Sequence, residues 1–268
     1  MNRQPILQHA CETHRSVGAE VKAFMRKVSG VKEESITDFL MWRWAEADPH
    51  FHYMRASSYS RYDESTKTGA DFEVEIWIVS DTGSLPLLFQ AKKLTKPFAG
   101  YWQKLAYPKS TKQQLSMLID YSQQVGRLPF YAFYADTDNP HGSRCLCGAA
   151  CDSAVFIADA HAIKSFVDAT PRRRISKADL IKAGNPFHCL FCCPLRNVGY
   201  MSLLVEFMQA TQPVVRPPLP AYAKRLLDGT LEEGIELRDE KELPQSRLIG
   251  VYDMRSESSE QRKNNSSR

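Results

Sequence analysis

The chain has 268 residues, enough to bury one full hydrophobic core, and its 25% charged and 43% hydrophobic residues are typical of a soluble globular protein. It contains no apolar run long enough to cross a membrane, and its first residues lack the apolar segment of a secretory signal. The net charge of +4 permits nucleic-acid binding without requiring it. We therefore expect a cytoplasmic protein with no membrane partner.

The N-terminal part of the chain predicts two helices and a strand. Residues 16–29 carry apolar side chains at helical spacing, and residues 33–44 carry a second pattern of the same kind. The acidic side chains of Glu33 and Glu34 suit the positive end of the second helix. Residues 51–62 mix aromatic and polar side chains, which favours a strand that enters a sheet.

The clearest pattern lies in residues 70–78 and 85–94. In both segments apolar side chains alternate with other side chains, and this period of two puts the two sets on opposite faces of a strand. The turn-rich residues 80–84 between them are few enough for a hairpin. The polar faces are formed by Asp71, Glu73 and Glu75 on the first strand, and by Gln90 and Lys92 on the second.

These polar faces suit metal-dependent chemistry on a phosphate. The carboxylate of Asp71, the amide oxygen of Gln90 and the backbone carbonyl of Ala91 are oxygen ligands of the kind that Mg²⁺ binds, or Mn²⁺ in its place. The ammonium group of Lys92 could stabilise the negative charge that grows on a phosphate under attack. The alternative is a solvated face with cross-strand ion pairs. The apolar neighbours favour the metal site, because charged groups among them are costly unless they serve a function.

The sequence Thr68-Gly69-Ala70-Asp71, followed by Gln90-Ala91-Lys92, resembles the core motif of the PD-(D/E)XK, or restriction-endonuclease-like, nuclease superfamily. With Glu64 before it and Glu73 within it, the pattern TGADxE…QAK is similar to that of an uncharacterised bacterial branch of this superfamily. The resemblance covers residues 30–200. Gln90 replaces the commoner glutamate, which removes one metal-binding charge.

The resemblance implies an α/β fold with a mixed central sheet flanked by helices, and the alternating order of predicted strands and helices indicates the same architecture. It implies a Mg²⁺-dependent endonuclease that hydrolyses phosphodiester bonds in DNA. It also implies a setting such as antiviral defence, with a homodimer or a defence-system partner. Glu34, Asp71 and Gln90 are the implied metal ligands and, with Lys92, the implied catalytic residues. The second-tier candidates are Glu64, Glu73, Gln113 and Gln114.

After the hairpin, lysines at positions 92–112 are interleaved with aromatic residues. This mixture is expected of a phosphate-and-base surface, or of a solvated loop with its aromatic side chains anchored in the core. Further periodic segments predict helices at 110–121 and 161–168 and buried strands at 128–134 and 154–160.

Six of the seven cysteines fall within residues 145–193. Cys189 and Cys192 have the C-x-x-C spacing of a zinc site, and Cys147 and Cys151, or Cys145, could complete a set of four ligands. The alternative is that these are small side chains buried beside a helix and a strand. The sequence thus leaves open a structural Zn²⁺ in this segment.

The composition of the C-terminal part predicts the domain organisation. We expect a nuclease-like domain in residues 1–212, a proline-rich linker with a small C-terminal segment in 213–253, and a disordered tail in 254–268. Two other functions remain open. One is a nuclease-fold module that has lost catalysis and binds nucleic acid or a protein partner, and the other is a zinc-stabilised interaction protein.

Overall fold

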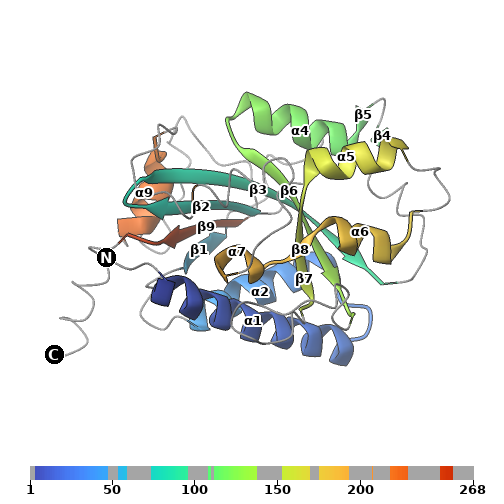
Figure 1. Cartoon of the computed structure of the whole chain (residues 1–268), viewed down its shortest axis with the longest axis horizontal. Coiled ribbons are helices and arrows are strands. Elements are labelled where there is room, and N and C mark those ends of the chain that lie inside the picture. The colour runs from blue at the N-terminus through green and yellow to red at the C-terminus, as the bar shows by residue number, and fades with distance from the viewer. Residues whose placement is uncertain are drawn as a thin grey trace.

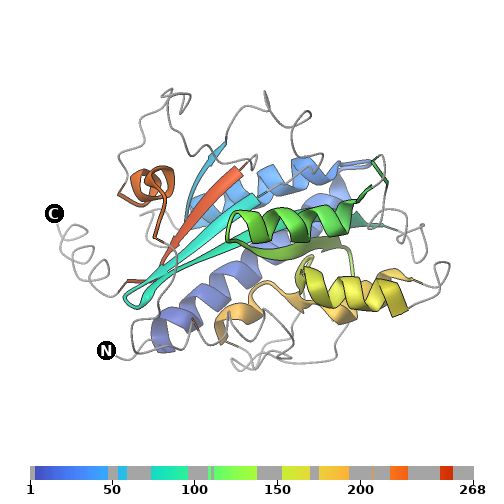
Figure 2. The same ribbon diagram turned by 90° about the horizontal axis from the view of Figure 1, so that it is seen from above.

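The computed structural model describes residues 4–47, 54–58, 74–95, 108–109, 112–137, 153–169, 175–192, 207, 218–228 and 248–255. Within these residues, seven strands form one mixed sheet that is covered by helices on both faces (Figures 1 and 2). This arrangement confirms the predicted α/β class with a mixed central sheet. None of the helices in these ranges is long and apolar enough to span a membrane.

The strands of the sheet have both antiparallel and parallel neighbours. In order across the sheet, the strands are β1 (Met54–Ser58), β9 (Leu248–Asp253), β2 (Val74–Ser80), β3 (Gly83–Leu94), β6 (Leu128–Ala135), β7 (Val155–Asp159) and β8 (Asn185–Pro186). β3 pairs with β2 in an antiparallel hairpin, while β3 with β6 and β2 with β9 are parallel pairs. A separate short ladder joins β4 (Pro108–Lys109) to β5 (Lys112–Gln113).

The predicted hairpin is confirmed, and its turn is stabilised by contacts between neighbouring residues. The hydroxyl groups of Ser80 and Thr82 hydrogen-bond at 2.8 Å. Gly83 has a φ of 140°, a conformation that residues with a side chain rarely adopt. The alternation of side chains along β3 is also confirmed, because Leu87 and Phe89 pack in one hydrophobic cluster and Leu88 packs in the other.

The two faces of the sheet are covered by different helices. α1 (Gln4–Lys27), α2 (Glu33–Ala47) and α7 (Cys189–Cys192) cover the face of Leu87 and Phe89. The other face carries α4 (Gln114–Gln124), α5 (Ala160–Ala169), α6 (Lys177–Ala183) and α9 (Ala221–Asp228). In Figure 1 the pair α1 and α2 lies below the sheet, and α4 and α5 lie above it.

The C-terminal strand belongs to the central sheet. β9 lies between β1 and β2, and α9 packs against β9 and against Trp77 of β2. The sequence predicts a proline-rich linker and a small C-terminal segment for residues 213–253, and β9, which lies in this range, is a strand of the central sheet. The short apolar run Leu248–Asp253 gives no local sign that its partners lie far earlier in the chain.

Candidate functional site

The candidate site lies at the carboxyl end of β3, where the strand meets the start of α2. Gln90 and Lys92 follow Leu88 on the face of β3 that is opposite to Phe89 and Ala91. The apolar set anchors the strand in the core. The packing of Phe89 and Ala91 and the register of β3 with β6 therefore determine where the side chains of Gln90 and Lys92 leave the strand.

Glu33, the first residue of α2, connects the helix to β3. Its carboxylate lies 3.5 Å from Nζ of Lys92 and accepts a hydrogen bond of 2.9 Å from the backbone N–H of Lys93. Nζ of Lys93 donates to the carbonyl of Val31, just before the helix. The side chain of Lys92 is 13% exposed and that of Glu33 is 33% exposed, so the ion pair is partly shielded from water. The positive end of α2 also favours a carboxylate at this position.

Sequence reasoning selected Glu34 and missed Glu33. Glu34 is half-buried in the first turn of α2, but the carboxylate that reaches Lys92 and Lys93 belongs to the residue before it. Successive helical residues point about 100° apart, so an error of one position changes the direction of the side chain. The helix-start position common to both glutamates was the signal, and it could not choose between them. The role of Glu34 as a metal ligand stays a prediction.

Gln90 is buried, and its amide oxygen has no hydrogen-bond partner among the described residues. Leaving a buried acceptor unpaired costs roughly 1–3 kcal/mol, so this atom is a candidate ligand for a water molecule or a metal ion. Its register neighbour on β6 is Tyr131, whose hydroxyl group also lacks a partner in the described part of the chain. Burial raises the pKa of Tyr131, which keeps the phenol neutral. Two unsatisfied polar side chains thus stand side by side on this face.

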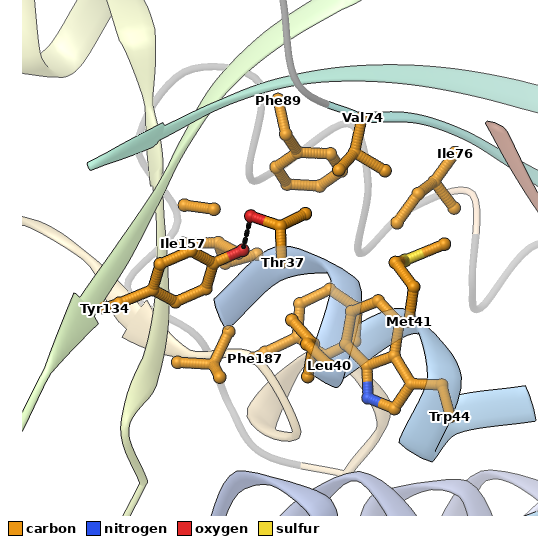
Figure 3. Close-up of a pocket in the computed structure, with 12 residues that line it drawn as sticks. Thr37, Leu40, Met41, Trp44, Val74, Ile76, Phe89, Tyr134, Ile157 and Phe187 are labelled. Atoms are coloured by element: carbon orange, nitrogen blue, oxygen red, sulfur yellow. Dashed lines mark hydrogen bonds between the residues drawn. The ribbon is translucent and has the colours of Figure 1, made fainter. Parts of the chain in front are cut away.

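A small cavity lies on the opposite face of the sheet, between the strands and α2 (Figure 3). Its volume is about 20 Å³, which is room for one water molecule and not for a substrate. Oγ1 of Thr37 donates to the carbonyl of Glu33 at 3.0 Å and therefore accepts the hydroxyl proton of Tyr134 at 2.9 Å. The rest of the lining is apolar. These contacts fix the first turn of α2, and with it Glu33, against the sheet.

Several predicted site residues lie outside the described part of the chain or away from the candidate site. Glu64, Asp71, Glu73, Cys147 and Cys151 lie outside the described residues. Gln113 ends β5 and Gln114 begins α4, where its side chain is half-buried. Cys189 is buried at the start of α7, and Cys192 ends the same helix. In the part of the chain that the structure describes, no three His, Cys, Asp or Glu side chains are grouped to hold a metal ion.

A second buried polar cluster lies on the same face as Gln90, and sequence reasoning did not identify it. The carboxylate of Glu75 accepts from the indole N–H of Trp77 and from the hydroxyl of Tyr222, and lies 3.5 Å from Nε of Arg127. The guanidinium group of Arg127 stacks over the ring of Trp77 at 4.6 Å. Burial and the Glu75 carboxylate raise the pKa of Tyr222. The cluster joins α9 to β2 and to the start of β6.

His14 of α1 is buried among aromatic rings on the other face. Its ring stacks on Phe191 with centroids 4.7 Å apart and meets Trp44 and Phe187 edge-on. Burial, with a smaller effect from His188, lowers the pKa of His14 to about 3. The ring is therefore neutral at physiological pH and behaves as part of the core.

The chain belongs to DUF6615, a family of unknown function, whose sequence model matches residues 10–257. The match begins within α1 and ends beyond β9, so the whole described sheet lies within the family region. Neither the curated proteins nor the solved structures gave a match to the chain.

Proposed function

We propose that this family member is a metal-dependent endonuclease that hydrolyses phosphodiester bonds in DNA at the carboxyl end of β3. The observation that carries the proposal is the buried, unpaired amide oxygen of Gln90, which lies two residues before Lys92 on β3, so that both side chains leave the strand on the same face. An amide oxygen of this kind can be a ligand of a metal ion. The resemblance of Asp71 and Gln90-Ala91-Lys92 to the PD-(D/E)XK motif supports the same assignment.

Asp71, Gln90 and Glu34 are the proposed ligands of Mg²⁺ or Mn²⁺. Asp71 precedes Val74 by three residues, so their Cα atoms are at most about 11 Å apart. Val74 is in register with Phe89, the neighbour of Gln90, so the length of the chain allows a contact between Asp71 and the amide oxygen. When bound, the ion lowers the pKa of a water ligand and neutralises charge on the phosphoryl oxygens.

Lys92 stabilises the charge that develops on the phosphate, and Glu33 positions Lys92. The carboxylate of Glu33 is itself fixed by the N–H of Lys93, and it lies 3.5 Å from the ammonium group. This contact restricts the rotamers of a long side chain. A cation that is oriented before the substrate arrives needs little reorganisation in the transition state.

Cleavage of supercoiled plasmid DNA tests the proposal. Purified protein should nick or linearise the plasmid in Mg²⁺ or Mn²⁺ and leave it intact in EDTA. The variant Asp71→Asn, prepared in parallel, should be inactive and equally well folded. A protein that binds DNA but cuts it in neither metal ion would contradict the proposal.

A catalytically inactive module that binds nucleic acid or a protein partner is the second candidate. Two observations favour it: Gln90 lacks the charge of the commoner glutamate, and Lys92 is paired with Glu33. In that case no metal ion would support cleavage. From the composition we also propose a cytoplasmic location, and from the resemblance a role against foreign DNA, as a homodimer or with a defence-system partner.

A further inference from the structure

Cations from two other elements gather beside the candidate site. Leu94 at the end of β3 is in register with Ala135 at the end of β6, so Asp136 and Thr137 follow directly next to the end of β3. Figure 1 shows the ends of these strands between α6 and the C-terminal end of α1. Side chains of α1 and α6 converge on these two residues.

Three contacts define this convergence. Nε of Arg26 donates to both carboxylate oxygens of Asp136 at 2.9 and 3.0 Å, and Nη2 lies 2.8 Å from one of them. Lys22, one turn earlier in α1, donates to the carbonyl of Thr137 at 2.9 Å. Lys177, the first residue of α6, donates to the carbonyl of Asp136 at 3.1 Å. Three cations therefore meet at a two-residue segment that carries one carboxylate.

We propose that Arg26 and Lys177 bind the phosphate backbone of duplex DNA next to the candidate site. The side chain of Arg26 is 53% exposed and Lys177 is half-buried, so both can reach a ligand, whereas Lys22 is buried and fixes the end of β6. With Lys92 and Lys93 of β3, they form a basic edge along the carboxyl ends of the two parallel strands. The proposal rests on the proposed function, because it extends the substrate contact of the same site.

The hairpin end of the sheet has a different set of charged side chains. There, Nε and Nη2 of Arg255 contact the carboxylate of Asp253 at 3.0 and 3.1 Å. The hydrogen bonds that Arg255 donates to Asp253 and the charge of that carboxylate, followed by the charges of Asp228 and Asp81, raise the pKa of Arg255. Three carboxylates thus act on the one guanidinium group of Arg255 at the hairpin end, whereas at the carboxyl end of β6 the cations of Arg26, Lys22 and Lys177 meet the single carboxylate of Asp136. An excess of cations at this end favours the approach of a polyanion to it.

The salt dependence of DNA binding tests this inference. The measurements are made in EDTA, so that the DNA is not cleaved during them. The affinity of a fluorescent duplex of about 20 base pairs is measured by anisotropy over a range of NaCl concentrations for the unmutated protein and the R26Q/K177Q variant. Each lost phosphate contact reduces the magnitude of the slope of log K against log salt by about 1, so the slope for the R26Q/K177Q variant should be smaller in magnitude by about 2. The matched control is Arg255→Gln, which removes an arginine from an Arg–Asp pair at the hairpin end and should leave the slope unchanged.

Asp136→Asn separates contact with DNA from support of the fold. Removing this carboxylate leaves Arg26 more available to phosphate, so the affinity for the duplex should rise. If Arg26 only held the end of β6, both R26Q/K177Q and Asp136→Asn would weaken binding, and the inference would be overturned. An unchanged slope in R26Q/K177Q, or no binding of duplex by the unmutated protein, would overturn it as well. Loss of slope without any plasmid cleavage would instead refute the proposed nuclease while the DNA surface stands.

Discussion

Replacing Lys92 with methionine should separate a catalytic cation from a structural ion pair. Methionine keeps the length of the side chain and removes the charge. In the proposed mechanism this charge acts on the transition state, and the loss of one such contact lowers turnover by about 10²–10³-fold, or about 2.7–4 kcal/mol. In a purely structural role, the same change would affect stability alone.

The cost in stability follows from the geometry of the pair. Two unit charges 3.5 Å apart attract by about 1 kcal/mol in water and about 5 kcal/mol at an effective dielectric constant of about 20. Because Glu33 is 33% exposed, screening keeps the net value near the exposed limit, about 1 kcal/mol. For a chain of this size that corresponds to a fall in Tm of about 2–4 °C.

The double variant E33Q/K92M decides between the two roles. The amide oxygen introduced by Glu33→Gln would still accept from the N–H of Lys93 and would carry no unpaired charge, so the double variant should regain the lost Tm. It should not regain turnover. Plasmid cleavage rates and thermal unfolding are measured on the same preparations of the two single variants, the double variant and the unmutated protein. Cleavage by K92M at the unmutated rate would refute the role given to Lys92.

Three further predictions concern other parts of the chain. Gln90→Leu should abolish metal-dependent cleavage yet raise the unfolding free energy by about 1 kcal/mol in urea titrations, because it removes a buried acceptor without a donor; a large loss of stability would contradict this. The folded-state pKa of His14, about 3, lies below its unfolded value of 6.5, so its contribution is full above pH 6.5 and falls by about 1.4 kcal/mol per pH unit below it. Between about pH 7 and pH 5 the unfolding free energy should drop by about 2 kcal/mol more than in His14→Phe, and equal drops would refute the assignment. If residues 145–193 form a zinc site, elemental analysis should find near one zinc per chain. In a structure of the zinc-bound protein, the sulfurs of Cys189 and Cys192 should then lie about 2.3 Å from the ion. Folded protein without zinc would exclude the site.

The hairpin could be predicted because its information is local. A period of two in β2 and β3, with a glycine at the turn, defines which side chains share a face before any partner is known. Gln90 and Lys92 were placed on one face in this way. The same pattern did not reveal that Gln90 would be buried without a partner, since burial depends on what packs over the strand.

Other parts of the site depend on contacts that one sequence does not record. Glu33 and Glu34 have the same chemistry and adjacent positions, and only the rotation of α2 against β3 decides which of them meets Lys92. The cluster around Glu75 joins residues from β2, the start of β6 and α9. The hydrogen bond from Tyr222 to Glu75 joins residues that are 147 positions apart in the chain, and no spacing rule links them.

The position of β9 has a consequence for the order in which the protein can be completed. Val74 of β2 is in register with Leu248 of β9, far later in the chain. Until β9 is added, β2 exposes one row of backbone amide and carbonyl groups, and β1 has no strand beside it within the described sheet. Pairing over such a separation is slow, and an open strand edge invites association with other chains. During synthesis the sheet therefore remains divided between β1 and β2 until residues 248–253 leave the ribosome, and nascent chains shorter than this expose strand edges that β9 covers in the complete protein.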